Sequence, residues 1–150
     1  MWHEGFVPDL AAWVLNALAL AFGALLGARA LIDPHWAARL VRLRADDAQP
    51  GGFAEFRATF GGVFLGLHGA ALVLSLYWIL NGIAVVGVCA IGASGAVAAG
   101  WFGAAFGRAL SLWRDKGTRT RFNLISIGVE TLVGLLIAAP WVTWLFQGAG

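Results

Sequence analysis

The sequence has very little charge. Only 12% of its 150 residues are Asp, Glu, Lys or Arg, whereas a soluble domain has about 25%. It contains one cysteine, Cys89, which excludes an internal disulfide, a CxxC redox pair and a cysteine-based zinc site. The net charge of +2 is too small to suggest a nucleic-acid partner. These shortages argue against a soluble enzyme and against a nucleic-acid-binding protein.

Long apolar runs take the place of charge. Hydrophobic residues make up 60% of the chain, and it has 21 glycines, which are more frequent in transmembrane helices than in soluble ones. Four stretches reach the length of about 20 residues that a helix needs to cross a bilayer. They are residues 10–32, 56–80, 83–107 and 122–147. We predict an all-α integral membrane four-helix bundle that forms a single domain over residues 1–150.

The second and third stretches must be separate helices. As one straight helix, Ala58 to Gly107 would be roughly 75 Å long, more than two bilayers thick. Asn81-Gly82 is the turn signal near the midpoint of this run. We therefore predict a tight hairpin between helices two and three.

Basic residues are absent from both chain ends and from the predicted hairpin. All ten Lys and Arg residues lie in or beside the first and third connections. The positive-inside rule places such connections in the cytoplasm. We predict a multi-pass protein of the bacterial inner (cytoplasmic) membrane with both termini periplasmic.

The first connection contains an amphipathic segment, His35 to Arg44 (HWAARLVRLR). Its apolar residues Trp36, Leu40 and Leu43 share one helical face, so the segment suits an interfacial helix on an anionic membrane surface. An ordinary basic flank of a membrane span explains it equally well.

Aromatic residues gather near the predicted ends of the spans, as in the belts that form where membrane meets water. The outer belt would contain Trp2, Trp13, Tyr77, Trp78, Trp141 and Trp144, and the inner belt Trp36, Trp101 and Trp113.

Small residues recur at helical spacing on three of the predicted helices. The residues concerned are Gly62, Gly66 and Gly69 in helix two, Gly92, Ala96, Ala99, Gly103 and Gly107 in helix three, and Gly134 and Ala138 in helix four. Small faces allow helices to approach closely in lipid. We expect these faces to pack the bundle against itself; the alternative is that they receive a partner subunit, a second copy or membrane lipid. In helix four, Pro140 predicts a bend near Leu136.

Glu130 is the acid deepest in any span, roughly 12 Å from the start of helix four. A membrane-buried acid is a functional candidate by default, and it must be paired, bind a cation or stay protonated. Asn123 and Ser126 lie on the same helical face. Glu130 is either a structural partner or a functional acid, and the sequence leaves both open.

His68 lies at a similar depth in helix two, where it either donates a hydrogen bond to Glu130 or bonds to a backbone carbonyl. Glu55, Arg57 and Arg108 cluster at the cytoplasmic rim, and Arg108 is placed to pair with either Glu55 or Glu130.

Several of these residues resemble the motifs of a family of small bacterial four-helix membrane proteins defined as a domain of unknown function. The run from Glu55 to Gly62 resembles its opening motif. Arg108 to Ser111 with Asp115 and Gly117 resembles the second motif, although Lys116 separates an acid and a glycine that are usually adjacent there. Glu130 resembles its acid in the last helix. The resemblance covers about residues 53–139 and implies a fold but no activity.

Three function classes follow. The first is a non-enzymatic accessory or scaffold protein that packs against partner helices or lipid. The second is a small proton- or cation-coupled transporter that uses Glu130. The third, a membrane enzyme, is disfavoured because the chain has one cysteine, no phosphate loop and only one histidine, His68, inside a span, too few for paired haem ligation. We expect no metal, no cofactor and no catalytic residue, and we favour the first class.

Overall fold

The computed structural model describes residues 9–44 and 51–147. Within these ranges every regular element is helical. Four helices are long and apolar enough to cross a membrane: Leu10–Ile32, Gly52–Asn81, Ala84–Arg114 and Arg121–Phe146. The predicted all-α four-helix bundle is confirmed, and these four helices indicate a multi-pass membrane protein.

Two aspartates set the limits of the first two helices. Helix α1 (Leu10–Ile32) begins after Asp9, whose carboxylate accepts hydrogen bonds from two backbone N–H groups of the first turn. Asp33 ends α1 and caps the next helix, α2 (Pro34–Val41), by accepting from the Trp36 N–H at 2.9 Å. Pro34 occupies the first position of α2, where a missing N–H is harmless. The amphipathic segment of the first connection is thus helical, with Arg42 ending it at φ 58°.

The second span combines two types of helical turn in three segments. It starts with α3 (Gly52–Glu55), continues as a π-helix, η1 (Phe56–Gly62), and ends as α4 (Val63–Asn81). Gly82 stops α4 at φ 64°, a left-handed conformation that suits glycine, and its N–H donates to the Trp78 carbonyl. Helix α5 (Ala84–Arg114) starts directly afterwards, so the predicted tight hairpin is confirmed.

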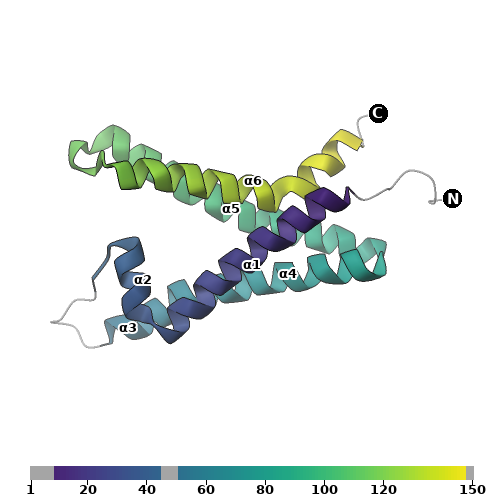
Figure 1. Ribbon diagram of the computed structural model, residues 1–150, viewed down its shortest axis with the longest axis horizontal. Helices are drawn as coiled ribbons and strands as arrows, with labels where there is room; N and C mark the ends of the chain where they lie inside the picture. Colours follow the sequence, from purple (N-terminus) through teal and green to yellow (C-terminus); the bar gives the residue numbers. More distant parts are fainter. Residues whose placement is uncertain (1–8, 45–50, 148–150) are drawn as a thin grey trace.

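Helix α5 is longer than the sequence suggested, whereas the last span has nearly the predicted bounds. Helix α5 continues to Arg114 rather than ending at Gly107. A short 3-10 turn, η2 (Lys116–Thr118), leads to α6 (Arg121–Gln147). Pro140 lies within α6, and Figure 1 shows the bend of α6 toward its C-terminal end, as predicted from the proline.

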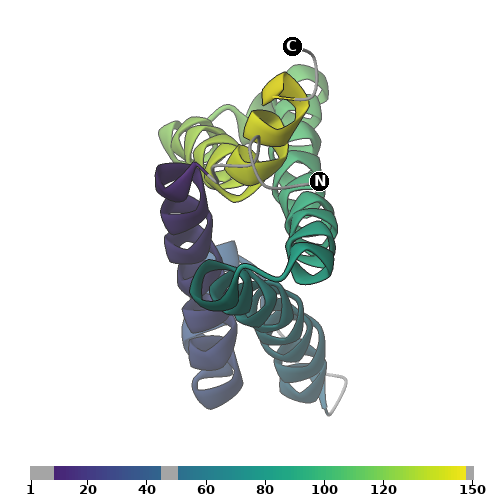
Figure 2. The same cartoon turned by 90° about the vertical axis from the view of Figure 1, so that its right-hand side faces the viewer.

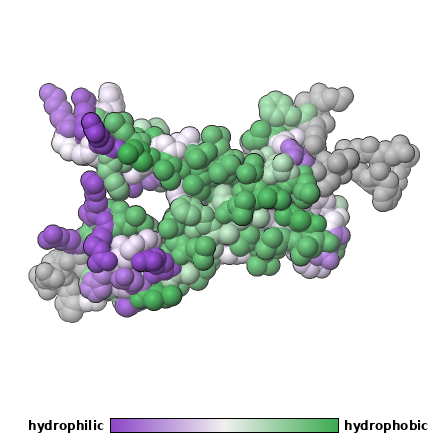
Figure 3. All heavy atoms as spheres, viewed as in Figure 1, coloured by the Kyte–Doolittle hydropathy of each residue, from purple (hydrophilic) through white to green (hydrophobic). Residues whose placement is uncertain are grey.

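The helices pack as two pairs. Helix α1 lies along α4, α5 lies along α6, and the pairs also contact each other through α1 with α6 and α4 with α5. The pairs cross and then diverge toward the end that contains α2 and η2 (Figures 1 and 2). We call this end the charged half and the end with the Asn81-Gly82 turn the hairpin half. Hydrophilic side chains gather mainly at the charged end, and the middle of the molecule is apolar (Figure 3).

The core lies where the pairs cross. One cluster of buried residues includes Leu20 of α1, Ala71 of α4, Ala98 of α5 and Ile137 of α6. A second cluster near the hairpin contains Trp13, Trp78 and Ala90. Trp13 and Trp78 are 3% and 7% exposed and their rings lie 6.0 Å apart. Their assignment to an aromatic belt was therefore wrong, because these indoles fill the interior instead of meeting the membrane surface.

The small-residue faces predicted on helices two and three are also corrected. A side-chain carbon built at Gly66, Gly69, Gly103 or Gly107 would meet nothing, and at Gly62 it would meet only a carbonyl of its own helix, at 3.5 Å. These glycines do not pack the bundle against itself. The helix-four face does pack inward as predicted, because a side-chain carbon at Gly134 would collide with the Phe102 ring and Ala138 is buried in the core. The other closely packed glycines are Gly23, Gly27, Gly61 and Gly87. Sequence spacing identified small faces without showing which face of each helix points inward.

Candidate functional site

Glu130 of α6 is paired with Arg108 of α5. The Arg108 Nε donates to Glu130 Oε1 at 2.7 Å. The Glu130 side chain is 10% exposed and that of Arg108 is 32% exposed, so the acid is buried and the base reaches toward the surface. This geometry matches a charge-assisted hydrogen bond. Of the two partners expected for Arg108, the structure selects Glu130 over Glu55.

Asn123 supports this pair from the beginning of α6. Its side-chain oxygen accepts from Arg108 at 3.4 Å, and its Nδ2 donates to the Thr118 carbonyl at 2.7 Å. Asn123 thereby ties Arg108 to the turn between α5 and α6. Ser126 is half-buried on the same helix, and within the described residues its side chain joins no hydrogen bond.

One oxygen of Glu130 remains without a partner. Oε2 is buried and accepts no hydrogen bond from the described residues. A buried carboxylate oxygen in this state is able to hold a proton or accept from a donor that enters the site. Among the buried side-chain nitrogen and oxygen atoms of the described residues, this oxygen is the one without a hydrogen-bond partner.

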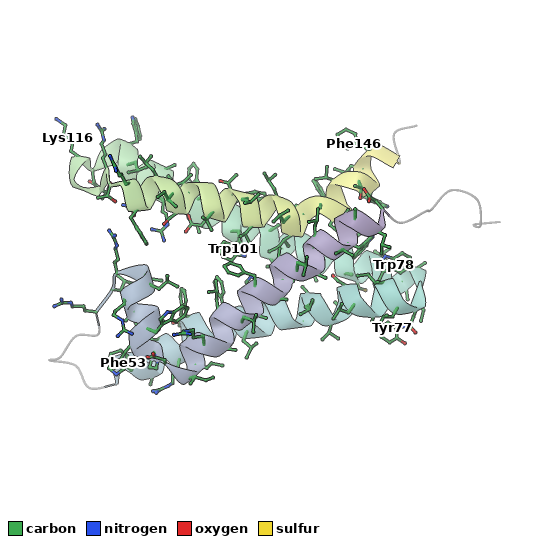
Figure 4. All side chains as sticks on the ribbon, viewed as in Figure 1. Phe53, Tyr77, Trp78, Trp101, Lys116 and Phe146 are labelled. Atoms are coloured by element: carbon green, nitrogen blue, oxygen red, sulfur yellow. The ribbon has the colours of Figure 1, made fainter. Side chains whose placement is uncertain are left out.

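His68 of α4 occupies a different contact from the one considered with Glu130. Its Nδ1 lies 2.8 Å from the Phe64 carbonyl, and Trp101 of α5 donates from Nε1 to His68 Nε2 at 2.9 Å. Because indole is only a donor, Nε2 is the acceptor and Nδ1 carries the proton. The histidine is therefore neutral and bonded to a backbone carbonyl, the second of the two predictions. Trp101 lies where the two helix pairs meet (Figure 4), not in an inner aromatic belt.

The ring of His68 also explains a glycine. A side-chain carbon at Gly23 of α1 would collide with this ring. The imidazole packs on Phe64 with centroids 4.7 Å apart, and Phe64 in turn meets Trp101 edge-on at 5.7 Å. His68 is thus a packed interior residue that joins α1, α4 and α5.

A third polar group, which sequence reasoning passed over, joins all four spans. Asn16 of α1 is 0% exposed. Its Nδ2 donates to Ser94 Oγ of α5 at 3.0 Å and to the Ile137 carbonyl of α6 at 2.6 Å. Its Oδ1 accepts from Ser75 Oγ of α4 at 2.8 Å. The signal was present, because Asn16 is the strongly polar residue of its apolar run and such a residue needs partners.

The bend of α6 contributes to this network. Pro140 has no N–H, so the helix loses a backbone hydrogen bond to Leu136 and is distorted there. The carbonyl that accepts from Asn16 belongs to the next residue, Ile137. The proline bend and the asparagine therefore lie at one level of the bundle, where a neighbouring helix supplies a donor to the bent backbone.

The remaining rim residues do not form the predicted cluster. Arg57 Nε donates to the Leu31 carbonyl at the end of α1, at 3.2 Å. Glu55 is exposed and lines a cavity beside α2. Arg42 places its guanidinium 3.8 Å from the centre of the Phe122 ring, so it connects the first connection to α6 across the charged half.

Residues 9–44 and 51–147 contain no group of three or more His, Cys, Asp or Glu side chains placed to hold a metal ion.

In comparisons with known proteins, no family model, no curated protein and no solved structure matches this chain.

Proposed function

We propose that this chain is a non-enzymatic membrane accessory or scaffold protein that packs against partner helices or lipid. The observation that supports it most directly is the contact between Arg108 and Glu130, because the acid has a fixed partner on the neighbouring helix. His68 and Asn16 are likewise held by other helices. These polar side chains form hydrogen bonds between helices, so they stabilise the bundle and are consistent with a structural role.

The outward face of α5 supports the second half of the proposal. This α5 outer face contains Gly92, Ala96, Ala99, Gly103 and Gly107, all exposed. A glycine in an exposed helix interior is about 1 kcal/mol less favourable than alanine. The chain does not need these glycines for its own packing, since a side-chain carbon at each would meet nothing. A partner helix that approaches closely does need them.

A pair of leucine variants tests this proposal. Gly103→Leu blocks the α5 outer face, while Gly128→Leu adds the same bulk at an equally open position of α6. Both proteins should melt at the wild-type temperature in mild detergent. Mass spectrometry of co-purifying subunits and lipids should show Gly103→Leu losing a component that wild type and Gly128→Leu retain. If both variants keep every component, the α5 outer face is not a contact surface.

A second function has one observation in its favour. The unpartnered Oε2 of Glu130 is the kind of site that a proton- or cation-coupled transporter requires. Transport requires that this oxygen exchange its proton or ion with both sides of the membrane. Proton flux into liposomes, compared between wild type and Glu130→Gln, separates the two functions.

The location and family of the chain belong to the same proposal. We propose the bacterial inner membrane, with the basic connections cytoplasmic and both termini periplasmic, because all ten Lys and Arg residues belong to the charged half. Green fluorescent protein fused after Gly150 should not fluoresce, because it does not fold in the periplasm after export. A fluorescent fusion would show that the C-terminus is cytoplasmic and would contradict this orientation.

We also propose that the chain is related to the four-helix family defined as a domain of unknown function. The motifs around Glu55, Arg108 and Glu130 support this relation.

A further inference from the structure

A cavity lies at the charged end, between α2 and the start of the second span. Its volume is about 400 Å³. Apolar walls come from Val41, Leu43, Phe56 and Phe60, and two charged side chains, Arg44 and Glu55, line it as well. A site with one positive charge, one negative charge and apolar walls suits a ligand that is both zwitterionic and amphipathic. We call it the α2 cavity.

The backbone beside the α2 cavity has an uncommon form. The π-helix η1 begins at Phe56, directly after Glu55, and carries both phenylalanines of the cavity wall. Such wide turns are rare and occur frequently at functional sites. The Thr59 hydroxyl donates to the Glu55 carbonyl at 2.6 Å and so supports the turn from within the span. The π-helix therefore shapes a wall of the cavity while the span continues through it.

The two charges of the α2 cavity are available to a ligand. Both side chains are exposed, and the ion pair found within the described residues is that of Arg108 with Glu130. Arg57, two residues beyond Glu55, is occupied by the Leu31 carbonyl. Arg44 therefore offers donors to a phosphate and Glu55 offers an acceptor to an ammonium.

We propose that the α2 cavity binds the headgroup of a phospholipid that carries a primary ammonium, as in phosphatidylethanolamine. Arg44 would bind the phosphate, Glu55 would accept from the ammonium, and the apolar walls would cover the glycerol and the first acyl carbons. An anionic lipid without an amine, such as phosphatidylglycerol, offers Glu55 hydroxyl donors but no positive charge, so the hydrogen bond is weaker. Phosphatidylcholine brings a quaternary ammonium that has no N–H to donate. This inference is independent of the α5 outer face, which belongs to another helix.

The test is a lipid competition. The protein in mild detergent is exposed to mixed micelles with equal amounts of phosphatidylethanolamine, phosphatidylcholine and phosphatidylglycerol, and bound lipid is read by native mass spectrometry. Wild type should bind the ethanolamine lipid about fivefold more than either competitor, as expected for one charge-assisted hydrogen bond at an exposed site. Equal binding of the three lipids would overturn the proposal.

Two variants and two controls locate the effect. Glu55→Gln should abolish the preference among the three lipids, and Arg44→Gln should reduce binding of all of them. Asp115→Asn and Arg39→Gln remove exposed charges outside the cavity lining and should behave as wild type. Melting temperatures confirm that each variant folds. A preference that persists in Glu55→Gln, or that Asp115→Asn also removes, assigns the selectivity to general surface charge and refutes the site.

Discussion

The hairpin half and the charged half are held together by different chemistry. In the hairpin half, Asn16 hydrogen-bonds to α4, α5 and α6 from a position with 0% exposure. In the charged half the helix pairs diverge, and the ion pair there has an arginine that is 32% exposed (Figure 1). Neutral amide and hydroxyl groups can satisfy one another in a dry core, whereas charges remain less costly near water. The first half therefore contributes more to the stability of the bundle, and the second has charged groups that remain exposed.

The largest effect should come from Asn16→Ala. The substitution removes three hydrogen bonds and strands two buried hydroxyls, of Ser75 and Ser94. Hydrogen bonds between membrane helices contribute about 0.6 kcal/mol on average and up to about 1.7, so we expect a loss of about 3 kcal/mol. Unfolding in mixed micelles measures it. Asn81→Ala, which removes an exposed bond within one helix, should change little; equal losses would show that the network is not special.

An intermediate effect should come from the ion pair. Glu130→Ala strands Arg108, and breaking a buried pair costs about 3–5 kcal/mol. Arg108 is partly exposed, so solvent reduces the loss to about 2 kcal/mol. Glu130→Gln keeps an acceptor and should lose less. Replacing Glu130 and Arg108 together with methionine should recover stability relative to Glu130→Ala, because no charge is left unpaired. A double variant that is less stable than Glu130→Ala would contradict the pairing.

The smallest effect should come from the contact across the charged half. Arg42→Gln removes the guanidinium that lies over Phe122, an interaction worth about 0.5–1 kcal/mol at an exposed site. Global stability should hardly change, but the amides of α2 should exchange faster with deuterium. Arg39→Gln, on the same short helix, is the control. Equal exchange in both variants would show that Arg42 does not hold the two helix pairs together.

The sequence was sufficient to predict the architecture, but it did not show which side of each helix points into the bundle. Span lengths, the Asn81-Gly82 turn and the Pro140 bend are local properties, so they could be read directly. Which side of a helix points inward depends on neighbours, and for this reason the outward Gly103 and the inward Gly134 were not distinguished.

The candidate site shows the same limit. Depth in the membrane left two candidate partners for Arg108, Glu55 and Glu130. The register of α5 against α6 determines that the partner is Glu130. Depth also placed His68 near Glu130, but the Trp101 indole occupies the available ring nitrogen. The network of Asn16 was predictable in part, because an amide and two serines in apolar runs require partners. The contact of Asn16 with Ser75 and Ser94 at one depth of the bundle depends on how the helix pairs cross, which the sequence does not show.

The central claim is that Glu130 is a structural partner and not a transport acid. Proton flux into liposomes with wild-type protein or Glu130→Gln, under an imposed pH gradient and read by an entrapped pH-sensitive dye, tests it most directly. We predict that wild-type liposomes acidify no faster than protein-free liposomes and that Glu130→Gln gives the same trace. Proton flux in wild type that Glu130→Gln abolishes, with the variant melting at the wild-type temperature, would contradict the claim and assign Oε2 to transport.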